Sequence, residues 1–180
     1  RWEYLLGIIK IGLPAGLQSM VFSLSNVVIQ AAINSFGSDG IAGSTAEQNF
    51  EFMAYFVINA FAQTATTFTS QNFAAQDKER CKKIYRLCTF IGLASCLGLS
   101  LIFLIGRHLF IQIFSTDENV IHYAMIRMWS VCLLELLTGV YEISGGCLRG
   151  MGHSMTPAVI TVLGTCVFRL VWVNTIYAAH

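Results

Sequence analysis

Long apolar stretches alternate with short polar segments along the whole chain. Five stretches hold roughly twenty or more mainly apolar residues, the length that a helix needs to cross the hydrocarbon core of a bilayer. They cover about residues 13–36, 50–73, 87–106, 120–148 and 156–177. The pattern predicts an all-α membrane protein with about five transmembrane helices, joined by short connections and packed as one antiparallel bundle.

Lys and Arg gather on one side of this predicted bundle. If the spans alternate in direction, eight of them fall on the side where the chain starts, and only Arg107 and Arg127 fall on the other. Cytoplasmic segments of membrane proteins carry the excess of Lys and Arg, so the chain start is predicted to face the cytoplasm. The run from Gln76 to Arg86 is then a topology determinant that is attracted to anionic lipid.

Composition supports the membrane assignment. The 180 residues are 55% hydrophobic and 12% charged, with a mean hydropathy of +0.63 and a net charge of +1. Soluble domains carry about twice that charged fraction. No large basic patch indicates a nucleic-acid partner. The six cysteines form no CxxC pair and the four histidines have no ligand spacing, so neither a metal site nor a disulfide framework is predicted.

Polar side chains recur at helical spacing inside the first two spans. Asn26 and Gln30 continue a stripe that begins at Ser19 and Ser23, and Asn59 and Gln63 begin a second stripe. Polar groups in a lipid-embedded helix face inward, where they either join helices or line a wet cavity. Both interpretations stay open for the four amides, which are our candidates for a substrate cavity. Phe and Tyr residues beside the stripes are suited to bind flat organic cations through their ring faces.

Two carboxylates and one guanidinium lie well inside the last two predicted spans. Glu135 and Arg169 each lie thirteen residues from the cytoplasmic end of their span, roughly 20 Å deep at 1.5 Å per residue. They are therefore a candidate structural ion pair. Glu142 lies nearer that end, with Arg149 as its only evident partner. An unpaired carboxylate at that depth would bind a cation or take up a proton, so Glu142 and Glu135 are candidates for ion coupling.

Three motifs together resemble the multidrug and toxic compound extrusion (MATE) family. The run Ile11–Gln18 (IGLPAGLQ) resembles the start of that family's second half. The segment Ser70–Ala75 (SQNFAA), followed by Arg80, is similar to a helix-end motif of the family. Gly145–Gly152 (GGCLRGMG), with Pro157 shortly after it, is similar to the motif that closes the tenth helix. The resemblance covers nearly the whole chain.

The resemblance implies a fold and a function. Members have twelve helices in two six-helix lobes that rock between inward-open and outward-open states, and they export organic cations in exchange for sodium ions or protons. The chain, residues 1–180, would then be part of the C-terminal lobe, helices seven to eleven. The missing initiator Met and the ending after a fifth span also lead us to expect a fragment whose partner is the N-terminal lobe of the same polypeptide.

The resemblance also implies which residues act. The acid that some members carry in helix ten falls near Thr138, which joins Glu135 and Glu142 as an ion-coupling candidate. Tyr141 joins the cavity candidates. No cofactor is expected beyond the coupling ion. The expected location is the plasma membrane, and the expected partners are lipid and a small amphiphilic or cationic substrate.

Three alternatives remain beside export. One is a flippase for lipid-linked oligosaccharides from the same superfamily, although such a protein would usually have a more basic cavity. Another is a membrane assembly subunit that transports nothing. The third, intramembrane catalysis by Glu135 or Glu142, lacks a paired acid, a zinc motif or a Ser–Lys dyad, so the chain is not expected to be an enzyme.

Overall fold

The computed structural model of the chain describes residues 2–175, with the side chains at positions 133 and 172 excepted, and this part contains helices and no strand. The helices are α1 (Trp2–Asn34), α2 (Gly37–Ala74), α3 (Lys78–Ile105), α4 (Arg107–Gln112), α5 (Glu118–Gly150), α6 (Met155–Thr161) and α7 (Phe168–Thr175), with the π-helical segment η1 (Val162–Val167) between the last two. The all-α prediction is confirmed. Positions 176 and 177 of the last predicted span lie outside the described residues.

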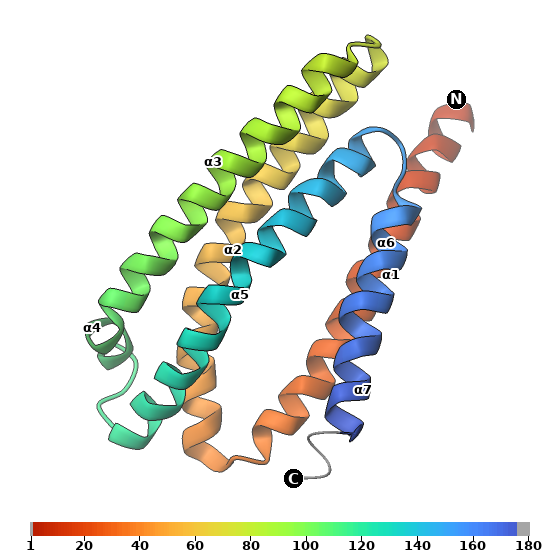
Figure 1. Cartoon of the computed structure of the whole chain (residues 1–180). Coiled ribbons are helices and arrows are strands. Elements are labelled where there is room, and N and C mark those ends of the chain that lie inside the picture. Colours follow the sequence, from red (N-terminus) through yellow and green to blue (C-terminus); the bar gives the residue numbers. More distant parts are fainter. Residues whose placement is uncertain (1, 176–180) are drawn as a thin grey trace.

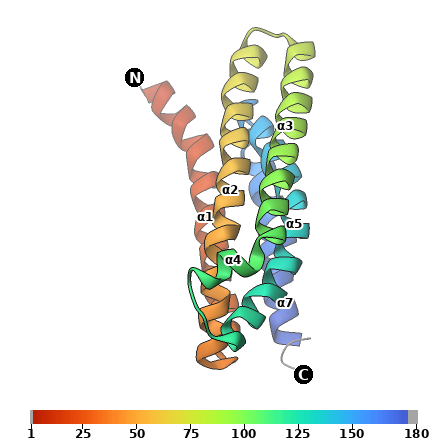
Figure 2. The same ribbon diagram turned by 90° about the vertical axis from the view of Figure 1, so that its left-hand side faces the viewer.

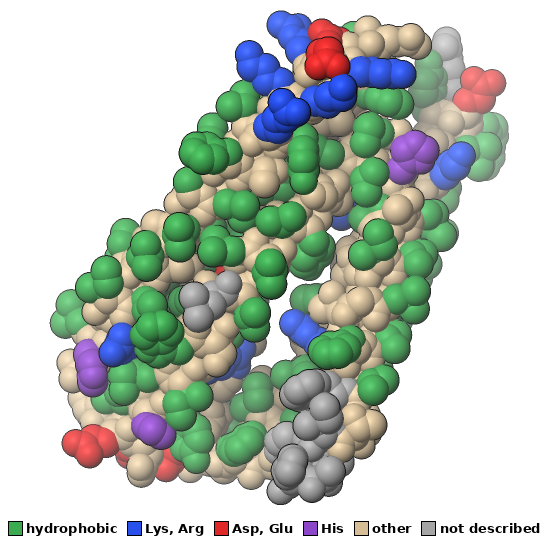
Figure 3. Space-filling view, in the orientation of Figure 1, with side chains coloured by type: hydrophobic (Ala, Val, Ile, Leu, Met, Phe, Trp, Pro, Cys, Tyr) green, Lys and Arg blue, Asp and Glu red, His purple; other side chains and the backbone are tan. Residues whose placement is uncertain are grey.

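The helices form two packed groups (Figures 1 and 2). One group contains α2, α3 and α5, and in the other the α6–η1–α7 segment packs along α1. A gap separates the groups over part of their length in the space-filling view (Figure 3). The start of α1, the α2–α3 turn and the α5–α6 turn all lie at the same end of the molecule (Figure 1).

Glycines allow the backbones of α2 and α5 to approach each other closely. A Cβ atom on Gly146 would lie 2.5 Å from the carbonyl oxygen of Ala62, and one on Gly150 would lie 2.5 Å from that of Thr66. On the other side of the same interface, a Cβ on Gly43 would lie 2.6 Å from the Val120 carbonyl oxygen. Helix association inside a bilayer depends on such close backbone approach, because lipid provides no hydrophobic drive between helices.

Many large apolar side chains point outward. Ile105 is 83% exposed, Trp2 77% and Phe90 75%. Three helical segments are long and apolar enough to cross a membrane: α1, α3 and the continuous stretch Met155–Thr175. Helix α5 adds a fourth if its two halves, which meet at 44°, count as one span. Exposed apolar surface on this scale is expected where lipid is the solvent.

Helix α2, which contains the predicted span 50–73, is not among these apolar segments. It contacts α1, α3 and α5, so protein covers much of its surface and polar residues are tolerated there. Its crossing of the membrane stays a prediction, as does the total of five spans.

Helix boundaries differ from those expected at three places. The Gly- and Ser-rich segment 37–48, which separates the predicted spans 13–36 and 50–73, forms the first turns of α2, and this helix begins at Gly37 with φ 78°. The basic run 76–86 lies mostly in the first turns of α3, where the Asp77 carboxylate accepts a hydrogen bond from the Arg80 backbone N–H. The expected loop 107–119 contains the short helix α4. Of these three helix starts, only that of α3 has a side-chain cap, so apolar composition alone did not predict where the helices begin.

Candidate functional site

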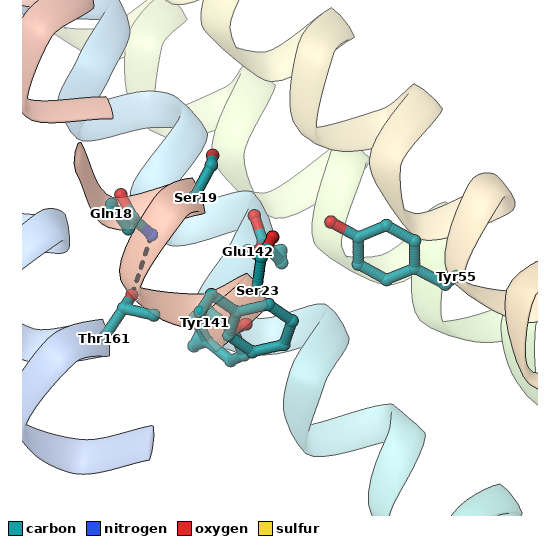
Figure 4. A pocket seen from close by; sticks show the side chains of 8 residues that line it. Gln18, Ser19, Ser23, Tyr55, Tyr141, Glu142 and Thr161 are labelled. Carbon is teal, nitrogen blue, oxygen red and sulfur yellow. Dashed lines mark hydrogen bonds between the residues drawn. The ribbon is translucent and has the colours of Figure 1, made fainter. Parts of the chain in front are cut away.

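A cavity of about 240 Å³ lies where α1, α2, α5 and α6 meet (Figure 4). Four of its residues come from α1, one from α2, two from α5 and one from α6. They are Gln18, Ser19, Phe22, Ser23, Tyr55, Tyr141, Glu142 and Thr161. The cavity therefore joins the two packed groups of helices, and a relative movement of the groups would change its shape.

Helix periodicity explains the contribution of α1. Gln18 and Phe22 are four residues apart, as are Ser19 and Ser23, so all four side chains share one face of the helix. Gln18 is buried and donates its amide to Thr161 Oγ1 at 2.9 Å. Ser19 donates to the Ala15 carbonyl of its own helix at 3.1 Å. The Gln18–Thr161 bond fixes α1 against α6 at the wall of the cavity.

Glu142 supplies the carboxylate of the cavity. Its side chain is 13% exposed, and Arg149 Nη2 lies 3.5 Å from its Oε2. The two residues are seven apart on α5, so their side chains are two turns apart on one helix face. Arg149 is the partner that the sequence indicated. Because this contact is long, the Glu142 carboxylate can still bind a second cation in the cavity.

Aromatic rings form much of the remaining wall. Phe22, Tyr55 and Tyr141 come from three different helices and all contribute to the lining. The guanidinium carbon of Arg169 lies 5.2 Å from the centroid of the Phe22 ring, so this ring already makes a cation–π contact. One carboxylate beside aromatic rings is an arrangement suited to an organic cation.

The structure distributes the predicted cavity residues unevenly. Tyr141 lines the cavity. Asn59 is not among the lining residues, but it donates to the hydroxyl of the lining residue Tyr55 at 3.4 Å. Gln30 donates to Asn34 on the same helix, and Gln63 is exposed. The two stripes therefore do not face one shared cavity over their whole length.

The ion-coupling candidates also separate. Glu142 lines the cavity, whereas neither Glu135 nor Thr138 does. Glu135 is 6% exposed within α5, and its Oε1 has no hydrogen-bond partner within the described residues. Thr138 is half-buried. Whether any of the three couples an ion stays a prediction.

The structure gives Arg169 a different partner from the Glu135 expected from sequence. Arg169 donates instead to the Asn26 Oδ1 at 2.7 Å, and no ion pair joins it to Glu135 in the part of the chain that the structure describes. The residue count gave equal depths but not the directions of the side chains. The π-helical segment η1 also changes the rotation of the residues that follow it, and α7 packs along α1.

Two lining residues were missed by the reasoning from sequence. Gln18 and Thr161 did not enter the stripes, although Gln18 stands one turn before Phe22 in an uncharged span. A buried amide in such a span requires a partner, and that requirement was the available signal. Among the described residues, no three His, Cys, Asp or Glu side chains are grouped so that they could hold a metal ion.

Comparison with known proteins decides the family. The sequence model of the MatE family matches residues 14–173 of the chain. The chain belongs to the MatE family. This assignment confirms the resemblance found in the three motifs, and it makes the chain part of a family of membrane transporters rather than of enzymes.

Several curated relatives are similar over most of the chain. They include the probable multidrug resistance protein NorM of Thermotoga maritima, 21% identical over 94% of the chain and 37% of its own length. The probable multidrug resistance protein YoeA of Bacillus subtilis is 22% identical over 89% of the chain and 35% of its length. The multidrug export protein MepA of Staphylococcus aureus is 24% identical over 89% and 36%. The chain thus spans little more than a third of the length of these relatives.

Proposed function

We propose that the chain forms part of the C-terminal lobe of a secondary antiporter that exports organic cations in exchange for sodium ions or protons. The observation that carries the proposal is the cavity between the two helix groups, with one carboxylate, Glu142, and three aromatic rings in its lining. The similarity to proteins named for multidrug resistance and export supports it.

Mutual exclusion at Glu142 provides a coupling mechanism. When a sodium ion or proton occupies the carboxylate, an organic cation loses its counter-charge, and the reverse holds when the organic cation is bound. Each ligand then shifts the protein toward the conformation that binds that ligand more tightly. The size of the shift depends on the difference between the ligand's affinities for the two conformations. Arg149, 3.5 Å from Glu142, would occupy the carboxylate when neither ligand is present.

Export requires a second body that moves against this one. The family relationship and the partial coverage of the relatives support a missing N-terminal lobe in the same polypeptide. In this arrangement the start of α1 and the α2–α3 turn face the cytoplasm, because they lie at the end rich in Lys and Arg (Figure 3).

The transport experiment uses the protein encoded by the complete reading frame that contains these residues. Cells without their own exporters are loaded with a fluorescent organic cation, and its accumulation is measured with and without the protein. We expect lower accumulation with the wild-type protein and full accumulation with Glu142→Gln. Glu79→Gln is the matched control, because Glu79 is an exposed carboxylate at the start of α3.

Two results would contradict the proposal. Unchanged efflux in Glu142→Gln removes this carboxylate from coupling, and Glu135→Gln then tests the remaining buried acid. No efflux by an expressed, folded wild-type protein in membrane vesicles, under either a sodium or a proton gradient, removes export itself.

Orientation has its own test. Single cysteines are placed in a cysteine-free protein at Gln76, in the α2–α3 turn, and at Thr116, between α4 and α5. A membrane-impermeant thiol reagent added to intact cells should label position 116 and not position 76. The opposite pattern would reverse the orientation.

A further inference from the structure

A second hollow lies at the α2–α3 hairpin, away from the cavity that contains Glu142. It is an open groove of about 500 Å³. Its lining residues come from the last turns of α2 and the first turns of α3. They are Phe68, Gln71, Asn72, Arg80, Lys83, Ile84 and Leu87.

The groove changes from cationic to apolar along its length. On α3 the lining residues Arg80, Lys83, Ile84 and Leu87 follow an i, i+3, i+4, i+7 pattern, which is one face of a helix. The two cations come first, nearest the hairpin turn, and Leu87 lies about 10 Å further along the axis. Phe68 on α2 likewise lies further from the turn than Gln71 and Asn72. The groove therefore has a charged outer end and an apolar inner end.

The cations at the outer end are only partly neutralised. Lys82, which does not line the groove, pairs with Glu79 at 2.8 Å. Arg80 has a loose contact with Asp77, 3.9 Å between Nε and Oδ2. Lys83 has no ion-pair partner within the described residues. Blue side chains gather around this end of the α2–α3 hairpin in Figure 3. An anion would find two available cations here.

We infer that this groove binds one anionic phospholipid, with its phosphate on Arg80 and Lys83 and an acyl chain along Phe68, Ile84 and Leu87. Guanidinium groups bind phosphate oxygens in a bidentate manner, and an ammonium adds a point charge. The charge of the groove's outer end is complementary to the phosphate. The lipid would lie against the α2–α3 hairpin with its head at the membrane surface.

The apolar end favours a phospholipid over a free anion. Phe68 is 51% exposed and Leu87 48%, so the inner part of the groove presents carbon rather than hydrogen-bond donors. A free phosphate would leave that surface unused, whereas an acyl chain covers it. The inference rests on the chain's place in a membrane and does not depend on the proposed export.

The test measures lipid binding to the intact protein purified in detergent, by native mass spectrometry. The probes are phosphatidylglycerol, which is anionic, and phosphatidylcholine with the same acyl chains. Two double variants are compared: Arg80→Gln with Lys83→Gln, and Lys82→Gln with Arg86→Gln. Each removes one Arg and one Lys from the first turns of α3, but only the first pair lines the groove. All four side chains are exposed, so both proteins should fold.

We expect wild-type protein to bind the first phosphatidylglycerol at least about tenfold more tightly than phosphatidylcholine, since two charge-assisted contacts are involved. The groove variant should lose this preference, and the control variant should keep it within about twofold. If both variants lost the preference for phosphatidylglycerol equally, or if neither lost it, the inference would be overturned. Either result would mean that the lipid is attracted by the overall positive charge of this end and not bound in the groove. Displacement of the lipid by millimolar inorganic phosphate would also overturn it and indicate a free-anion site.

Discussion

Arg127 on α5 contacts Glu47 on α2, with its Nε 2.6 Å from the Glu47 Oε2. The same guanidinium places Nη2 2.9 Å from the Glu51 Oε2 and donates to the Ser44 hydroxyl. Glu47 is 1% exposed, and within the described residues Arg127 is its ion-pair partner. The cluster joins the two helices at the end of the molecule opposite to the α2–α3 turn.

Replacing Arg127 should destabilise the protein strongly. Arg127→Gln leaves the buried Glu47 carboxylate without its cation, and loss of one partner of a buried pair costs roughly 3–5 kcal/mol. The melting temperature of the purified protein should fall markedly, while Arg86→Gln, an exposed arginine, leaves it nearly unchanged. The double variant Glu47→Gln with Arg127→Gln should recover part of the loss. A double variant less stable than Arg127→Gln alone would argue against the buried pair.

The partner of Arg169 can be tested by a double-mutant cycle. Arg169→Gln and Asn26→Ala should show a coupling free energy of about 0.6 kcal/mol and at most about 1.7 kcal/mol, the average and the maximum for polar contacts between membrane helices. The parallel cycle of Arg169→Gln with Glu135→Gln should show none, because the structure pairs Arg169 with Asn26. Coupling only in the second cycle would restore the ion pair expected from sequence. Unfolding in denaturant gives both values.

Gly146 and Gly98 should respond in opposite ways to the same substitution. Gly146→Ala places a methyl group 2.5 Å from the Ala62 carbonyl oxygen and separates α2 from α5, at a cost of roughly 1–3 kcal/mol. Gly98→Ala, in α3, meets nothing within 4 Å and should be neutral or stabilise by up to about 1 kcal/mol. Thermal unfolding compares them. A harmless Gly146→Ala would show that the two helices are not in close contact there.

The Gln18–Thr161 hydrogen bond should contribute to the joining of α1 and α6. Thr161→Val removes the acceptor and leaves a buried amide unsatisfied, at a cost of roughly 1–3 kcal/mol. Ser19→Ala removes only a bond to the backbone of its own helix and should cost less. The double variant Gln18→Leu with Thr161→Val removes both partners and should be more stable than Thr161→Val alone. Thermal unfolding of the three proteins decides the order.

Reasoning from sequence succeeded where the residues that carry the information all lie on one helix. The resemblance in the motif around Gly145–Gly152 is confirmed by the family match. Arg149 is the partner of Glu142, as their spacing on one helix indicated. These statements need only the helical period and the identity of the residues.

It failed where two helices had to be oriented relative to each other. Depth along the axis is proportional to residue number, but the direction of a side chain depends on the rotation of its helix. The π-helical segment before Arg169 changes that rotation without an evident mark in the sequence. Gln18 and Thr161, 143 positions apart, meet for the same reason: the packing of α6 along α1 decides it.

By itself, then, the order of residues determined a helical membrane protein, its family and the face of each helix that carries polar groups, because apolar length and a period of 3.6 are local properties. Only the tertiary structure decided that Glu142, and not Glu135, shares a cavity with Phe22 and Tyr55. That choice depends on how separate helices pack, bend and rotate against one another, and such contacts are set by all the helices together.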